Sequence, residues 1–140
     1  MDLLKEHNDK FRFFAEITGL AMKVHNKYHP GRLESAYEAA LKYLLETDGH
    51  KVEQQVSLPL YWDEVKLDQT YRIDLLVDEN IICELKSVGH TTEEHVRQLW
   101  SYMCITHKPY GMLINFGSER LYSAWYYQDA DGYIEKVKLF

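Results

Sequence analysis

The spacing of apolar residues changes near residue 50, and this change indicates a fold that combines helices with strands. Before it, from Phe11 to Tyr28, apolar residues recur every three or four positions, which predicts an amphipathic helix. The same spacing predicts a second helix over about 33–47, which Gly49 ends. After the change, from Val52 to Leu60, apolar residues largely alternate with polar ones, which predicts a half-buried strand.

The remainder of the chain continues this mixture of elements. Residues 71–77 and 81–86 have the composition of strands and flank a polar turn at 78–80, so they predict a hairpin. Thr91 with Glu94 forms a capping-box pattern, which predicts the start of a third helix. That helix is expected to end near Lys108-Pro109, and three further strands are expected at 110–116, 121–127 and 133–140. The predicted order is ααβββαβββ, without repeats or linkers.

Length and composition predict a single folded domain over residues 1–140. A chain of 140 residues is close to the usual size of one domain, and a hydrophobic share of 46% is enough to bury a core. No run of about 18 uncharged apolar residues is present to cross a bilayer, and the first six residues lack the apolar run of a signal peptide. We therefore expect a cytoplasmic protein with no membrane contact.

The charge balance excludes long-range attraction of a polyanion. Sixteen Lys and Arg residues stand against 22 Asp and Glu residues, which gives a net charge of −6. Any binding of nucleic acid must therefore be local. Cys83 and Cys104 both lie in apolar runs, which predicts two reduced thiols in the core.

Two acids and a lysine interrupt the otherwise apolar strands of the predicted hairpin. If the turn is centred on Glu79, Asp74 lies opposite Glu84, with their Cβ atoms about 4.5–5.5 Å apart. Like charges at that spacing destabilise a sheet, so a positive group is expected between them. Lys86 is two residues beyond Glu84, and its side chain therefore leaves the same face of the strand.

This arrangement has a functional interpretation and a structural one. Two converging carboxylates form the kind of oxygen site that Mg²⁺ uses while it keeps waters for a phosphate to replace. A nearby ammonium adds a donor for a phosphate oxygen or for an attacking water. The structural alternative is a salt bridge from Lys86 to Asp74 or Glu84 on a solvated face. Because the strands are apolar on both faces, idle charges there are costly, which favours the functional interpretation.

Three motifs in this sequence, the first of them in two separate halves, resemble those of known nucleases. Ile73-Asp74 followed by Glu84-Leu85-Lys86 resembles the PD-(D/E)XK nuclease motif. Residues 31–37 fit the Gly-x-x-Glu-x-x-Tyr signature of the GxxExxY proteins, a family assigned to that nuclease superfamily. Residues 98–102 look like the Gln-x-x-x-Tyr helix motif of RecB-type and Cas4-type nucleases. Similarity also covers residues 71–77 and 113–117.

The resemblance implies a fold, a metal and a set of site residues. The fold is α/β (α+β), with a restriction-endonuclease-like mixed central sheet flanked by helices, which agrees with the predicted element order. Asp74 and Glu84 would bind Mg²⁺, or Mn²⁺ in its place, with the Leu85 backbone carbonyl as a third ligand. Lys86 would orient or activate the attacking water. Glu34, on the second helix, would be an extra acid that completes the metal shell.

Glu34, Glu38 and Tyr102 each have a functional and a structural interpretation, and the structural one for both acids is a solvated side chain. Gln98 and Tyr102 form an i, i+4 pair on one helix face, able to reach a phosphate or Lys86. Tyr102 is otherwise a core residue. Glu38 lies one turn beyond Glu34, and the solvated interpretation is favoured for it.

Together these patterns favour a metal-dependent nuclease that hydrolyses phosphodiester bonds in nucleic acid, with DNA as the expected partner. Its predicted catalytic residues are Asp74, Glu84, Lys86, Glu34, Gln98 and Tyr102. The alternative is a non-catalytic module that binds nucleic acid or protein and keeps the nuclease fold as a scaffold. The net charge of −6 favours this alternative, whereas the presence of both acids and the lysine favours the nuclease.

Overall fold

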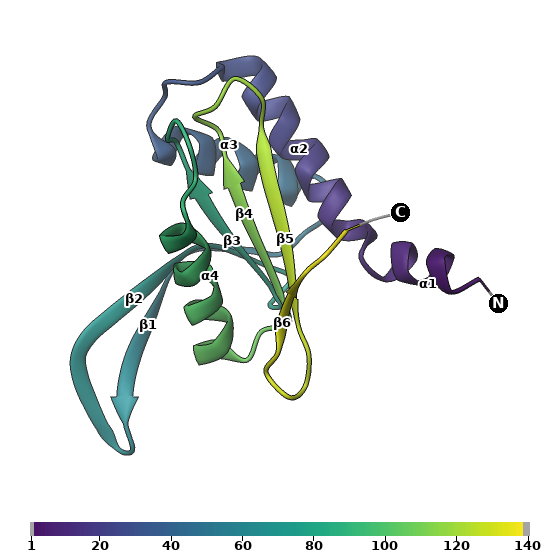
Figure 1. Ribbon diagram of the computed structural model, residues 1–140. Helices are drawn as coiled ribbons and strands as arrows, with labels where there is room; N and C mark the ends of the chain where they lie inside the picture. The colour runs from purple at the N-terminus through teal and green to yellow at the C-terminus, as the bar shows by residue number, and fades with distance from the viewer. Residues whose placement is uncertain (1, 139–140) are drawn as a thin grey trace.

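The computed structural model describes residues 2–138, which form a six-stranded mixed sheet with helices on both faces (Figure 1). This arrangement confirms the predicted fold class. The elements in chain order are α1 (Leu3–Lys10), α2 (Arg12–Tyr28), α3 (Glu34–Thr47), β1 (Val52–Trp62), β2 (Val65–Val77), β3 (Ile81–Lys86), α4 (Glu93–Thr106), β4 (Tyr110–Asn115), β5 (Tyr122–Gln128) and β6 (Ile134–Lys136).

The strands lie side by side in chain order, from β1 to β6. Only the β3–β4 pair is parallel, and every other neighbouring pair is antiparallel. A parallel pair needs a crossover connection, and α4 supplies it. The crossover places α4 on one face of the sheet, while α2 and α3 cover the other face (Figure 1).

Successive residues of β3 face the two helical layers in turn, as the period of a strand requires. Cys83 and Leu85 belong to the cluster formed with α2 and α3, and Ile82 belongs to the cluster formed with α4. On β4, Gly111 lets α4 approach closely, because an added Cβ would lie 2.5 Å from the Met103 Sδ. The sheet is thus buried on both sides at its centre.

Several element boundaries differ from those predicted. The spacing of apolar residues gave no sign of α1, which buries none of its side chains and has Asp2 as its N-cap. The fourth helix has its capping box at Thr92 and His95, one residue after the predicted Thr91 and Glu94, and the imidazole replaces the expected carboxylate. Cys104 is exposed on that helix, so the prediction of a buried thiol is correct for Cys83 alone.

The predicted last strand, 133–140, is shorter in the structure. β6 covers Ile134–Lys136, and residues 139–140 lie outside the described residues. Within residues 2–138, no helix has the length and apolar character needed to span a membrane.

The β1–β2 hairpin is longer than predicted, because β2 begins at Val65 and not at residue 71. Its outer part, residues 56–73, is called the arm here, and it extends past the other strands, away from α2 and α3 (Figure 1). The base of the arm packs against the α4 cluster through Val56, Leu58 and Tyr71. Beyond a register shift near Pro59, the arm tip, residues 61–65, is exposed to solvent.

Candidate active site

The candidate site lies where β2 separates from β3. The two strands pair from Val77 with Ile81 to Leu75 with Cys83, which confirms the predicted register. The next opposed residues are Asp74 and Glu84, and there the carboxylates bind main-chain groups. The Asp74 N–H donates to the Glu84 Oε1 at 3.2 Å, and the Leu85 N–H donates to the Asp74 Oδ2 at 2.8 Å. Because buried N–H groups need acceptors, the two acids stabilise the strand ends at this point.

Glu84 is the acid of the site that lies deepest in the protein and has a shifted pKa. Its side chain is only 3% exposed. Burial raises the pKa of Glu84 well above its ordinary value, and the negative charge of Asp74 raises it further. Lys86 acts in the opposite direction, because its positive charge lowers the same pKa. Asp74 and Lys86 are therefore close enough to Glu84 for electrostatic interaction with it.

Asp74 also interrupts the regular geometry of β2. Ile73 packs in the α4 cluster and Leu75 in the opposite cluster, although residues two apart on a regular strand share a face. On the neighbouring strand, the ladder skips the facing residue, Gln55, whose φ of 52° is left-handed. Such a conformation is unusual for a residue other than glycine, and strained backbone of this kind gathers at functional sites.

The side chain of Gln55 connects Asp74 to Glu38 on α3. The Gln55 Nε2 donates to the Glu38 Oε1 at 2.6 Å and lies 3.3 Å from the Asp74 Oδ1. The Gln54 Nε2 donates to the other Glu38 oxygen at 2.5 Å. Neighbouring residues of a regular strand point to opposite faces. The side chains of Gln54 and Gln55 can reach the same carboxylate only because the strand is distorted between them. Glu38 is consequently buried, which contradicts the solvated interpretation.

Lys86 and the helix α4 meet on the other side of the site. The Lys86 Nζ donates to the Gln98 Oε1 at 3.3 Å, so Gln98 reaches the lysine as one of its predicted targets. Tyr102, one turn further along α4, is 4% exposed. Burial raises the pKa of Tyr102 to about 12, with a further contribution from the charge of Glu84. The hydroxyl of Tyr102 is therefore a neutral donor close to the two acids.

The chain matches the PD-(D/E)XK nuclease superfamily over residues 12–125. It belongs to this superfamily. Among solved structures, the chain resembles the one described as "Crystal structure of SSO0001", with a TM-score of 0.50 and 19% sequence identity. The match covers 85% of this chain and 61% of that one, and at this identity it shows a shared fold alone. A search of curated proteins finds no match.

In this PD-(D/E)XK protein, Glu34 is the acid of α3 that was predicted at the site, whereas Glu38 is the acid of α3 that is linked to Asp74 through Gln55. Glu34 is exposed in the first turn of α3, and its role as a metal ligand stays a prediction. Glu38, one turn later, is the acid that contacts Gln55. Sequence reasoning gave no role to Gln55, because no period or motif signals a left-handed residue within a strand. The i, i+4 spacing of the two acids was the available signal for Glu38.

A tyrosine on α3, Tyr37, has a structural role in this PD-(D/E)XK protein. Its hydroxyl, on Tyr37, donates to the His29 carbonyl and accepts from the Arg32 N–H at 2.9 Å, which closes the loop between α2 and α3. The Tyr37 ring stacks on Phe116, with the ring centres 4.6 Å apart. These contacts hold the first turns of α3, and hence Glu38, against the sheet.

The loop after Lys86 is fixed by the end of β4. The buried Asn115 side chain accepts from the Val88 N–H at 3.1 Å and donates to the Val88 carbonyl at 2.9 Å. Gly117 lies so close that an added Cβ would be 2.3 Å from the Val88 nitrogen. Asn115 and Gly117 therefore position the main chain that follows the lysine.

The donor set of this PD-(D/E)XK domain fits a divalent cation that keeps several waters. No group of three His, Cys, Asp or Glu side chains within residues 2–138 lies close enough to form a metal cage. Mg²⁺ seldom needs one, because it is commonly bound through one or two carboxylates and retains water in its other positions. A cation beside Asp74 and Glu84 would offset the repulsion that raises the Glu84 pKa.

Proposed function

We propose that this protein is a metal-dependent nuclease that hydrolyses phosphodiester bonds in DNA. The observation that carries the proposal is the pair of facing carboxylates, Asp74 and Glu84, at the point where β2 and β3 separate, with Lys86 near enough for its charge to lower the Glu84 pKa. Glu84 is almost fully buried beside Asp74, whose negative charge adds to the burial that raises the Glu84 pKa. Buried acids with a strongly shifted pKa cluster at functional sites. Membership in the PD-(D/E)XK superfamily supports the same conclusion.

The residues that would hold the cation are Asp74, Glu84 and the carbonyl of Leu85, with Glu34 as a further predicted ligand. A bound Mg²⁺ or Mn²⁺ would supply positive charge to the phosphate and lower the pKa of a bound water. A cation in this position also provides the local attraction for a polyanion that a net charge of −6 does not provide at long range.

Three side chains of the site would then have different roles in the reaction. Lys86 donates a hydrogen bond that aims the attacking water in line with the leaving oxygen. Gln98 accepts from the Lys86 ammonium and thereby limits its orientations. Tyr102, which stays protonated at neutral pH because its pKa is about 12, can donate to a phosphate oxygen. This assignment gives a positioning role to Gln98 and a direct role to Lys86.

The alternative function is a non-catalytic module that binds nucleic acid or protein. The net charge of −6 is the observation that favours it. Titration with Mg²⁺ and Mn²⁺ by calorimetry separates the two functions, because a scaffold has no reason to bind either ion at Asp74 and Glu84. A nuclease binds the ion, and the variant Asp74→Asn loses that heat signal.

The decisive experiment incubates the protein with linear and closed circular DNA, single-stranded and double-stranded, in Mg²⁺, Mn²⁺ or a chelator. We expect cleavage only with a divalent ion. Lys86→Ala should lower the rate by about 10²- to 10⁴-fold, which is the usual contribution of a positioned proton-transfer group. Circular dichroism should show an unchanged fold, because Lys86 is only half-buried. A rate that does not depend on the lysine contradicts the assignment.

A further inference from the structure

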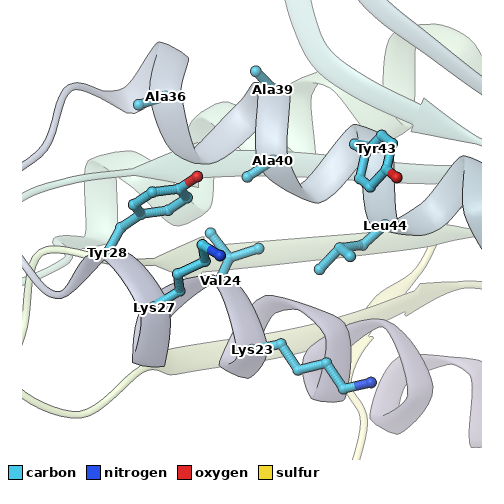
Figure 2. Close-up of a pocket in the computed structure, with 9 residues that line it drawn as sticks. All are labelled: Lys23, Val24, Lys27, Tyr28, Ala36, Ala39, Ala40, Tyr43 and Leu44. Atoms are coloured by element: carbon cyan, nitrogen blue, oxygen red, sulfur yellow. The ribbon is translucent and has the colours of Figure 1, made fainter.

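A groove of about 500 Å³ lies between α2 and α3. Figure 2 shows Val24 and Tyr28 of α2 facing Ala40 and Leu44 of α3 across this groove. The small alanine side chain leaves space between the helices, and the other three supply apolar surface. The volume lies within the range of about 300–1,000 Å³ that is typical of sites that enclose a ligand. The groove is thus suited to an apolar group of substantial size.

The charged residues that line this groove are all positive. Lys23 and Lys27 lie along its α2 side, and no acid lines it. Within residues 2–138, neither lysine forms an ion pair. In a chain with a net charge of −6, such a surface selects an occupant that combines apolar groups with negative charge.

The arm tip has this complementary chemistry. Trp62 is 72% exposed and Val65 is 62% exposed, although both are large apolar side chains. Between them lie Asp63 and Glu64, which make no ion pair within the described part of the chain. The acids also make the tip unsuitable for the phosphates of nucleic acid, which bind positive groups. Exposed apolar side chains that polar residues surround are one mark of a protein interaction site.

We propose that the groove binds the arm tip of a second copy of this chain, and that two copies exchange arms in a symmetric dimer. The tip does not reach the groove of its own chain, because the arm extends away from α2 and α3 (Figure 1). One tip in one groove is a small contact, whereas stable interfaces bury about 1,200–2,000 Å². Reciprocal exchange doubles the contact and closes the assembly with two-fold symmetry. None of the proposed metal ligands takes part, so the dimer does not depend on the proposed nuclease activity.

Two charge variants test the proposal by sedimentation velocity at increasing protein concentration. The tip variant combines Asp63→Asn with Glu64→Lys, and asparagine is chosen because residue 63 has a left-handed φ of 52°, which asparagine tolerates. The groove variant combines Lys23→Glu with Lys27→Glu. The unchanged protein should form dimers, and each variant alone should self-associate at least about tenfold more weakly, because like charges then meet.

A mixture of the two variants provides the sharper test. The basic tip of the first variant fits the acidic groove of the second, and the native tip of the second fits the native groove of the first. An equimolar mixture should therefore recover the dimer, and so should one chain that carries all four changes. Glu135→Lys with Lys5→Glu is the matched control, because it reverses two exposed charges outside both surfaces and should leave the dimer unchanged.

Three outcomes would overturn the proposal. The first is an unchanged protein that stays monomeric at all concentrations. The second is a dimer that survives both charge variants, which would place the contact elsewhere, for example along the exposed edge of β1. The third is a mixture that fails to recover the dimer although circular dichroism shows both variants to be folded. If the arm tip binds nucleic acid and not the groove, Glu64→Lys would bind DNA more tightly, and sedimentation velocity would show the same molecular mass as for the unchanged protein.

Discussion

At the scale of single residues, the site depends on side chains that replace missing main-chain contacts. Asp74 accepts from the Leu85 N–H, and Glu84 accepts from the Asp74 N–H. The pair could be predicted from sequence, because charges in apolar strands with a known turn have few available positions. Gln55 could not, since its left-handed backbone is imposed by contacts with Glu38 and Asp74 that join three separate elements.

The two acids on α3 give a prediction at this scale. Glu38→Ala should lower the free energy of unfolding by about 1.5–3 kcal/mol, because it removes hydrogen bonds to a charged group. It should also lower the rate of cleavage by about 10- to 100-fold, since Gln55 would no longer be held beside Asp74. Urea denaturation and the cleavage assay measure the two effects.

Glu34→Ala is the matched control for stability. Glu34 is exposed, so its loss should leave the free energy of unfolding within about 0.5 kcal/mol. A lower affinity for Mg²⁺ in this variant would confirm the predicted metal role of Glu34. If Glu38→Ala alters neither stability nor cleavage, the link through Gln55 has no importance for the site.

At the scale of elements, the order from α2 to β6 could be predicted, whereas α1 and the exact ends of the elements could not. Helices α2 and α3 have an apolar face that repeats every three or four residues, and β3 follows a clear turn. The outer half of the arm was missed because residues 65–70 are largely polar and exposed on a ribbon that leaves the core. α1 was missed for a related reason, as a helix that buries no side chain has no apolar period to detect.

The loop after Lys86 leads to a prediction about element packing. Gly117→Ala should lower the free energy of unfolding by about 1–3 kcal/mol, because the new methyl group meets main-chain atoms of Val88 that cannot move independently. Cleavage should fall as well, since the loop follows the lysine. Gly89→Ala in the same loop has no atom within 4 Å of the added Cβ and should be nearly neutral in urea denaturation. Equal stability of the two variants would contradict this account.

The turn between β2 and β3 predicts a dependence of stability on pH. The Asp78 carboxylate accepts from the His50 Nδ1 at 2.7 Å and from the Lys51 N–H at 3.0 Å. Partial burial raises the pKa of Asp78, but these hydrogen bonds outweigh it, so the pKa lies below its ordinary value. A lowered pKa stabilises the fold above the unfolded-state pKa, and this stabilisation is lost as pH falls through the folded-state pKa.

Asp78→Asn should therefore reduce the free energy of unfolding at neutral pH and make no difference in strong acid. The side chain is 44% exposed, so solvent screening limits the loss to about 1 kcal/mol or less. Asparagine also tolerates the left-handed φ of 51°, which keeps the turn intact. Urea denaturation at neutral pH and again below the folded-state pKa of Asp78 checks the sign. If Asp78→Asn still has a lower free energy of unfolding in acid, the loss comes from a change in the turn and not from the missing charge.

At the scale of the whole molecule, a net charge of −6 means that the proposed DNA binding would depend on the cation. We expect the cleavage-defective Lys86→Ala variant to bind labelled DNA at least about tenfold more tightly in Mg²⁺ than in chelator, because the ion supplies the missing attraction. Fluorescence anisotropy measures the two affinities. Asp74→Asn in the same assay should show little response to Mg²⁺, and tight binding in chelator would contradict the prediction.

The separation of β2 from β3 has a consequence for how this protein can change over evolutionary time. Asp74 closes a gap in the main-chain hydrogen bonding, so its loss would destabilise the fold even in a descendant that lacked the proposed nuclease activity. Lys86 is under no such constraint, because the hydrogen bond that its side chain makes within residues 2–138 is to the exposed amide of Gln98. Drift would remove the lysine first, and its survival in descendants is the sign that distinguishes a working enzyme from an inherited framework.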